Sequence, residues 1–340
     1  MEQVAVLHEE VAVEDKPTAK PLHEEVAVED KPTAKPWEAG RSCQRQRFMG
    51  TDKELRSGKG FAGRVRMICV ALNYEGTESP LGCVVDSERI STAAARSGVK
   101  DIVKLYDNGS TPRFPCKAEL ADAIGEVGSR CEANDYLVFC YSGHGDSEDN
   151  EAAPSGKDCM LCLRSRDGED ERMVDDELAR LLTTSLHPQV RVLVLVDACH
   201  SGGICDMDTP GLWEGRRACV ISGCTENQLS TDSGDGGVMT NALLQVMKRK
   251  KVRARRRQRD LSVQFVFNRM VDAMPEDEDD EDEDEDEDDE WEDDEEWDSE
   301  EGSSDDEDEE DSSEEEEEPG QDITLSWPVG QDPSKITWPF

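Results

Sequence analysis

From residue 64 onward, short apolar runs alternate with segments of helical spacing. Runs rich in β-branched side chains predict buried strands, at residues 65–72, 102–106, 136–141, 159–163, 190–196 and 218–222. Apolar positions three and four residues apart predict helices, at residues 81–97, 117–131, 178–185, 237–251 and 261–274. Strands that alternate with helices predict an α/β fold, with a mainly parallel central sheet joined by right-handed crossovers.

Two of the predicted strands end in residues that suit catalysis. The run 190–196 leads into DACHSGG and the run 136–141 into SGHGD, so one strand end carries Cys199 and the other His144. Open α/β sheets bind their ligands at the carboxyl ends of such strands. A cysteine nucleophile needs a histidine to take its proton and donors to hold the oxyanion. Either residue alone is more often structural, but together, beside glycines, they favour nucleophilic catalysis.

The order and separation of His144 and Cys199 resemble the caspase signature. Five successive blocks resemble those of metacaspases, which are caspase-like cysteine peptidases: NYEGTESPLGCVVDS, YSGHGD, VDDEL, DACHSGG and ISGCTENQLSTD. The resemblance spans residues 65–274 and implies a caspase-like three-layer αβα sandwich. Residues 64–206 would be large-subunit-like and residues 218–275 small-subunit-like, in the type I order. Glu226 departs from the GCxDxQ pattern common in the family, which leaves fine substrate preference open.

The resemblance implies roles for particular residues. Cys199 would attack the peptide carbonyl, His144 would act as general base and then general acid, and the N–H groups of Cys199 and Gly145 would hold the oxyanion. The family cleaves after Arg or Lys. Paired carboxylates can hold a guanidinium in a charge-assisted fork, and the matching pocket positions are Cys83, Asp86, Ser142 and Asp197. The alternatives are a surface charge for Asp86 and a loop cap for Asp197.

The resemblance also implies activation by Ca²⁺, with Asp158, Asp175, Asp176 and Asp206 at the matching positions. Four carboxylates from separate loops suit Ca²⁺, which takes oxygen ligands. Their spacing is not that of an EF-hand, so the sequence pattern alone does not predict this site. Asp175 and Asp176 also fit the N-cap of the helix that follows them.

The net charge of −43 belongs to one segment of the chain. Residues 276–318 hold 35 of the 81 acidic residues and no basic ones, which leaves 46 acidic against 38 basic residues elsewhere. Such a segment is expected to be disordered, and here it would be an insertion before a closing segment, residues 319–340. It could collect Ca²⁺, bind basic proteins such as histones, or pair with the basic run 248–259, which we favour. That basic run could also be a nuclear signal or an autoprocessing site.

Residues 1–63 are predicted to be a disordered leader, because residues 7–21 and 22–36 are identical copies of a charged, proline-containing fifteen-residue unit. Twelve cysteines without zinc spacing favour free thiols in a reducing cytoplasmic or nuclear setting. No apolar stretch reaches the length needed to cross a bilayer. We expect protein or peptide substrates, no direct nucleic-acid partner and a monomer.

The sequence therefore predicts a calcium-dependent cysteine endopeptidase that cleaves after Arg or Lys. Two alternatives stay open at this point. One is a catalytically silent caspase-fold scaffold that binds basic proteins through its acidic segment. The other is a related peptidase specific for Asn or Asp, against which the acidic pocket residues argue.

Overall fold

The computed structural model describes residues 41–43, 63–151, 153, 156–230, 236–248, 261–274 and 321–340, with backbone alone for the first of these ranges. All of them belong to one unit, Lys35–Phe340, and residues 1–34 lie outside the described ranges. The predicted acidic segment and most of the predicted leader and basic run also lie outside the described residues.

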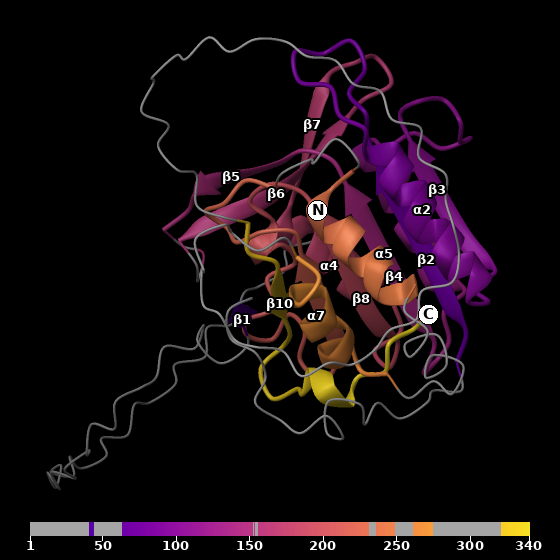
Figure 1. The fold of residues 1–340 in the computed structure, drawn as a ribbon, viewed down its shortest axis with the longest axis vertical. Coiled ribbons are helices and arrows are strands. Elements are labelled where there is room, and N and C mark those ends of the chain that lie inside the picture. The colour runs from indigo at the N-terminus through magenta and orange to yellow at the C-terminus, as the bar shows by residue number, and fades with distance from the viewer. Residues whose placement is uncertain are drawn as a thin grey trace, which may run out of the picture. The chain divides into compact units, whose positions relative to one another are not determined.

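The described residues form a large, mainly parallel sheet. Its strand order is β1-β10-β9-β8-β4-β2-β3 (Figure 1). The five parallel strands are β2 (Val65–Ala71), β3 (Asp101–Tyr106), β4 (Tyr136–Ser142), β8 (Arg191–Asp197) and β9 (Arg217–Ser222). Two short antiparallel strands extend one edge, β10 (Thr324–Ser326) and β1 (Arg41–Cys43). The strand β1 falls within the range that the sequence assigned to the leader.

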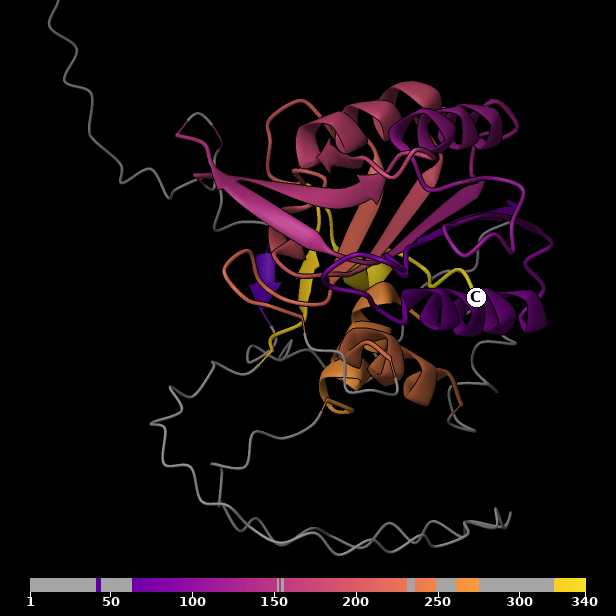
Figure 2. The same ribbon diagram turned by 90° about the horizontal axis from the view of Figure 1, so that it is seen from above.

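Helices cover both faces of this sheet, as Figure 2 shows. One face packs against α2 (Cys83–Arg96), α5 (Val238–Lys248) and α7 (Val263–Val271), and the other against α3 (Lys117–Ser129) and α4 (Asp175–Ser185). Successive strand side chains point to opposite faces, so Val138 joins the first hydrophobic cluster and Phe139 the second. Burial on both faces explains why the strands are continuous apolar runs. The predicted three-layer α/β architecture is confirmed.

A second, antiparallel sheet follows β4, in the order β5-β6-β7. Its strands are β5 (Gly145–Asp149), β6 (Lys157–Arg164) and β7 (Asp170–Val174). None of the strands predicted from the sequence covers residues 145–149, and β5 corrects that prediction. The strand β5 carries no apolar side chain, and it forms because its backbone pairs with β6, whose Leu161 lies in the core. The predicted cap is also wrong, because α4 begins at Asp175 and its N-cap residue, Val174, makes no side-chain cap bond.

The last twenty residues return to the sheet. After β10 they form a short 3-10 helix, Pro333–Lys335, and Thr337 bridges Ser262 at the start of α7. Trp338 and Phe340 are buried with their ring centroids 5.3 Å apart. The described part of the closing segment, residues 321–340, thus packs beside α7. None of the helices in the described ranges is long and apolar enough to cross a membrane.

Candidate active site

The ends of β4 and β8 lie side by side at the carboxyl edge of the large sheet. The two strands pair in register up to Ser142 and Asp197, and the N–H of Gly143 donates to the carbonyl of Asp197 at 3.3 Å. A Cβ on Gly145 would overlap the carbonyl oxygen of Cys199. The backbone that carries His144 therefore lies against the backbone that carries Cys199, and only glycine at 145 permits this approach.

The imidazole of His144 is held by a backbone group. Its Nε2 lies 2.8 Å from the carbonyl oxygen of Ser79, and its ring packs on Tyr74 with centroids 4.5 Å apart. A carbonyl can only accept, so Nε2 carries the proton and Nδ1 keeps the lone pair that can take a proton. The Ser79 carbonyl thus orients the histidine, as a carboxylate does in a triad. Sequence reasoning missed it, because a main-chain carbonyl leaves no residue-type signal.

Two buried tyrosines hold the backbone of His144. The hydroxyl of Tyr74 accepts from the N–H of His144 at 2.9 Å and donates to the carbonyl of Cys162 at 2.7 Å, while that of Tyr141 donates to the carbonyl of His144 at 2.7 Å. Burial raises the pKa of both tyrosines above the ordinary value of 10, so both keep their protons. A Cβ on Gly143 would lie 2.7 Å and 2.8 Å from the two hydroxyls, so this position also requires glycine.

The sulfur of Cys199 is partly buried and receives a backbone donor. The N–H of Ser230 points to it at 3.3 Å, and the carbonyl of the same residue lies 3.8 Å away. His200 follows in the left-handed region with φ 53°, which turns the chain into a short 3-10 helix, Ser201–Gly203. A hydrogen bond from an N–H group favours the thiolate over the thiol. This donor was also missed, although Ser230 lies inside a quoted sequence block.

The predicted pocket carboxylates meet at the start of α5. Asp86 and Asp197 are 1% and 5% exposed, so neither is a surface charge. The N–H of Gly237 donates to Asp86 at 2.7 Å, and the N–H and hydroxyl of Thr240 donate to Asp197 at 2.9 Å and 2.7 Å. The positive end of the helix dipole stabilises these two charges. Of the other predicted pocket residues, Ser142 is the register partner of Asp197 and Cys83 begins α2, one turn before Asp86.

The charges of the predicted calcium ligands act on one another. Burial, and then the charges of Asp175 and Asp176, raise the pKa of Asp206 to about 8. Burial raises the pKa of Asp175 to about 6, and the charges of Asp158 and Asp176 act in the same direction. Asp208 also acts on Asp206, and sequence reasoning did not include it. Across the described residues no three potential ligands are already arranged around a common point. The donors nevertheless fit a hard cation, since their excess negative charge is what such an ion neutralises.

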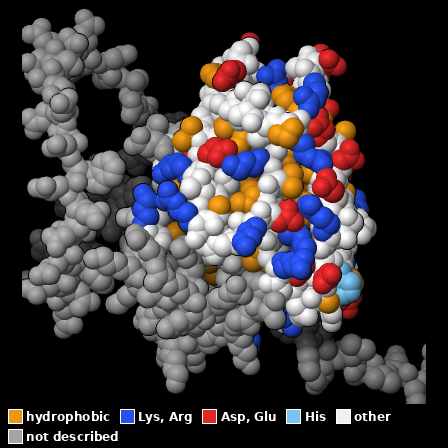
Figure 3. Space-filling view, turned by 90° about the vertical axis from the view of Figure 1, so that its right-hand side faces the viewer, with side chains coloured by type: hydrophobic (Ala, Val, Ile, Leu, Met, Phe, Trp, Pro, Cys, Tyr) orange, Lys and Arg blue, Asp and Glu red, His pale blue; other side chains and the backbone are white. Residues whose placement is uncertain are grey.

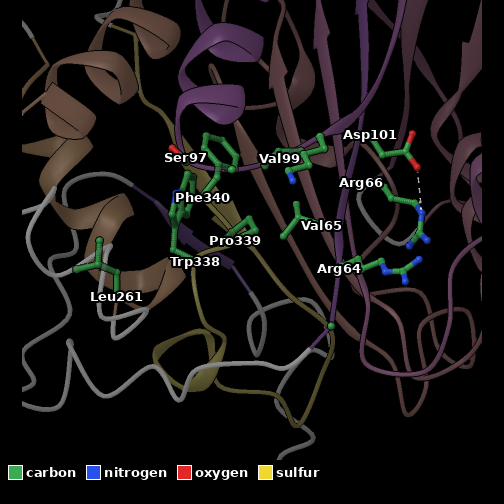
Figure 4. A pocket seen from close by; sticks show the side chains of 13 residues that line it. Arg64, Val65, Arg66, Ser97, Val99, Asp101, Leu261, Trp338, Pro339 and Phe340 are labelled. Carbon is green, nitrogen blue, oxygen red and sulfur yellow. Dashed lines mark ion pairs between the residues drawn. The ribbon is translucent and has the colours of Figure 1, made fainter.

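Two hollows lie away from the carboxyl ends of β4 and β8, which carry the candidate catalytic residues. A cavity of about 440 Å³ opens at the amino ends of β2 and β3, where Figure 4 shows Trp338 and Phe340 on one side and the Arg66–Asp101 ion pair on the other. A groove of about 920 Å³ runs between α2 and α5. Figure 3 shows hydrophobic side chains among Lys and Arg on the side of the molecule where α2 lies. Neither hollow contains His144 or Cys199 among its lining residues.

A cysteine and a histidine thus lie on adjacent strand ends of a three-layer α/β sandwich, an arrangement that suits nucleophilic catalysis. Residues 65–208 match the family model described as metacaspase, peptidase C14 domain. In this part, the chain is similar to the metacaspases, which are caspase-like cysteine peptidases.

Similar proteins carry the same family name. The chain is 29% identical over 222 residues to Metacaspase-1 of Arabidopsis thaliana and 32% identical over 161 residues to Metacaspase-1 of Kluyveromyces lactis. These matches cover 55% and 43% of this chain, and 60% and 35% of the relatives, so the chain spans only part of the relatives' length.

Two solved structures are also similar. A Geobacter sulfurreducens protein aligns with a TM-score of 0.46 at 25% identity, covering 62% of this chain and 89% of that one. Caspase-1 of Spodoptera frugiperda aligns with a TM-score of 0.39 at 15% identity, covering 63% of this chain and 83% of that one.

Proposed function

We propose that this protein is a cysteine endopeptidase that cleaves after Arg or Lys and is activated by Ca²⁺. One observation carries the proposal. The turns after β4 and β8 are in backbone contact, and they carry a histidine whose Nε2 is engaged by Ser79 and a cysteine whose sulfur faces an N–H donor.

The reaction follows from the proton positions. Nδ1 of His144 takes the thiol proton, and the Cys199 thiolate attacks the substrate carbonyl carbon. The N–H groups of Cys199 and Gly145 are the proposed donors to the oxyanion. The imidazolium then gives its proton to the leaving amine, which leaves a thioester. Water, deprotonated by His144, hydrolyses the thioester and restores the thiol.

Basic specificity is supported by the buried carboxylates of Asp86 and Asp197. The N–H groups at the start of α5 now stabilise the charges of Asp86 and Asp197. A substrate guanidinium or ammonium would neutralise part of this negative charge and would form charge-assisted hydrogen bonds with the carboxylates. An acidic side chain would be repelled by the negative charges of these two carboxylates. The same two carboxylates argue against the Asp-specific alternative.

Calcium activation is supported by the raised pKa values of Asp175 and Asp206. Asp206 ends the turn that follows the nucleophile, where its N–H donates to the carbonyl of Gly203 at 3.1 Å, and the charge of Asp175 acts on its carboxyl. With Asp158 and Asp176 they would bind the ion, which supplies charge neutralisation. That neutralisation would favour one position of the turn, and so of Cys199.

A set of fluorogenic peptides that differ only in the residue before the scissile bond tests the proposal. Wild type should cleave the Arg and Lys peptides in Ca²⁺, should lose activity in chelator, and should not cleave the Asp or Asn peptides. Cys199→Ala and His144→Ala should be inactive under every condition. A wild-type protein that ignores all basic peptides at every Ca²⁺ concentration would favour the scaffold alternative. Activity that is unaffected by chelation would end the calcium part alone.

The acidic segment, the duplicated unit of the leader and all but the first residue of the basic run lie outside the described residues. Their disorder, their pairing, self-cleavage at the basic run, a cytoplasmic or nuclear location and a monomeric state remain predictions from the sequence. Incubated wild-type and Cys199→Ala proteins, compared by mass spectrometry, separate self-cleavage from other proteolysis.

A further inference from the structure

The loop of residues 223–230 wraps around the end of the nucleophile strand. The N–H of Gly223 donates to the carbonyl of Val196 at 2.7 Å, and the N–H of His200 donates to the carbonyl of Gln228 at 3.0 Å. The loop thereby brackets Cys199 on both sides, and its last residue, Ser230, directs an N–H to the sulfur. The position of this loop therefore sets the position of a donor to the nucleophile.

Ser230 joins the nucleophile to the pocket. While its N–H faces the Cys199 sulfur, its hydroxyl donates to Asp197 at 3.0 Å. A displacement of this one residue would alter both the donor to the sulfur and a hydrogen bond to a proposed specificity carboxylate.

Gln321 and Asp322, which lie shortly before β10, hold the loop from outside. The side-chain amide of Gln321 donates to the carbonyl of Gly223 at 2.7 Å and to the hydroxyl of Ser230 at 3.2 Å, so it ties the two ends of the loop together. Its neighbour Asp322 exchanges two hydrogen bonds with the Gln228 side chain, at 3.1 Å and 3.2 Å. The amide of Gln321 uses one N–H on each partner, which is its full donor capacity.

We infer that Gln321 is a positioning residue, which holds Ser230 so that its N–H stays on the Cys199 sulfur and its hydroxyl on Asp197. The Ser230 hydroxyl accepts from Gln321 and donates to Asp197, and such chains of hydrogen bonds reinforce one another. That this positioning serves catalysis rests on the proposed function. The hydrogen bonds themselves, and their effect on the Cys199 thiol, do not depend on peptidase activity.

Alkylation of the thiol gives a readout that needs no peptidase activity. The rate at which iodoacetamide modifies Cys199 is followed over a pH series by mass spectrometry of the peptide that contains it. Gln321→Ala should raise the pH midpoint of this modification by about one unit, because the thiolate loses a fixed N–H donor. Its kcat/KM for an Arg peptide should fall about tenfold or more.

The closing segment offers a matched control. Gln331 lies in the same segment, and its side chain accepts from the N–H of Ala218 at 3.3 Å, at the opposite end of β9 from the loop. Gln331→Ala should leave the alkylation midpoint at the wild-type pH. Its kcat/KM should stay within about twofold of wild type. Gln321→Glu keeps the side-chain shape, removes both donors and adds a negative charge, so it should shift the profile in the same direction as Gln321→Ala and at least as far, even if the alanine variant folds poorly.

An alkylation profile of Gln321→Glu that superimposes on wild type would overturn the inference, as would an equal shift in Gln331→Ala. If wild type cleaves no peptide but the midpoint still shifts in the Gln321 variants, the proposed function fails and the positioning role stands. If wild type cleaves Arg peptides and the Gln321 variants match it in both measurements, the positioning role fails alone.

Discussion

Gly145→Ala probes the contact between the two strand ends most directly. A Cβ built on Gly145 would lie 2.0 Å from the carbonyl oxygen of Cys199 and 3.2 Å from the Cβ of Ala198. Real Cβ atoms do not approach other atoms within 3.0 Å. The main chain beside the nucleophile must therefore retreat by about 1 Å, because a backbone carbonyl cannot rotate away as a flexible side chain can.

A displacement of about 1 Å at a reacting group can cost about 100-fold in rate. We therefore expect kcat/KM for an Arg peptide to fall about 100-fold in Gly145→Ala, equivalent to about 2.7 kcal/mol of transition-state stabilisation. Overpacking should also lower the free energy of unfolding by about 1–3 kcal/mol, which most folded domains survive. Thermal unfolding of the same preparation shows whether lost activity reflects lost structure.

Gly125→Ala is the matched control. Gly125 lies inside α3, and a Cβ there would meet nothing within 4 Å. Alanine should stabilise this helix by about 0.5–1 kcal/mol and leave peptidase activity unchanged. If a folded Gly145→Ala protein kept wild-type kcat/KM, the close approach of the two strand ends would not matter for catalysis, and the geometric reasoning would be refuted.

Three further changes test other parts of the structure. Tyr74→Phe leaves the N–H of His144 without its acceptor, so kcat should fall about tenfold and the free energy of unfolding should fall by about 1–3 kcal/mol. An unchanged kcat would show that this hydrogen bond does not matter for catalysis. Asp206→Asn should raise the Ca²⁺ concentration for half-maximal activity at least about tenfold. Because the folded pKa of Asp206 is raised to about 8, without Ca²⁺ wild type should lose stability as pH rises from about 4 to about 8, and the variant should lose less, as denaturant unfolding will show. Burial alone would raise the pKa of Asp135, but hydrogen bonds from Glu132, Arg64 and Arg66 lower it below its usual value. The stability that Asp135 contributes is therefore present above about pH 4 and is lost as pH falls through its lowered pKa. Asp135→Asn should cost about 3 kcal/mol at neutral pH by leaving the buried Arg66 poorly compensated, and should flatten that acid slope in denaturant unfolding.

The sequence by itself determined the five parallel strands of the large sheet, its helical layers and the two strand ends with Cys199 and His144. Strands buried on both faces are continuous apolar runs, and helices that pack on a sheet are apolar at every third or fourth position. Both patterns can be recognised from the local sequence alone. The sequence also showed that glycines 143 and 145 flank His144. What these glycines make room for was not visible in the sequence, since it depends on which atoms approach from elsewhere in the chain.

Only the tertiary structure decided how these strand ends are completed. The carbonyl of Ser79, the hydroxyls of Tyr74 and Tyr141, and the amide of Gln321 reach the site from segments far apart along the chain. The strand β5 likewise exists only because β6 pairs with it. A hydrogen bond formed by the main chain, or by a polar side chain brought from a distance, leaves no periodic trace, because its geometry exists only after the chain has folded.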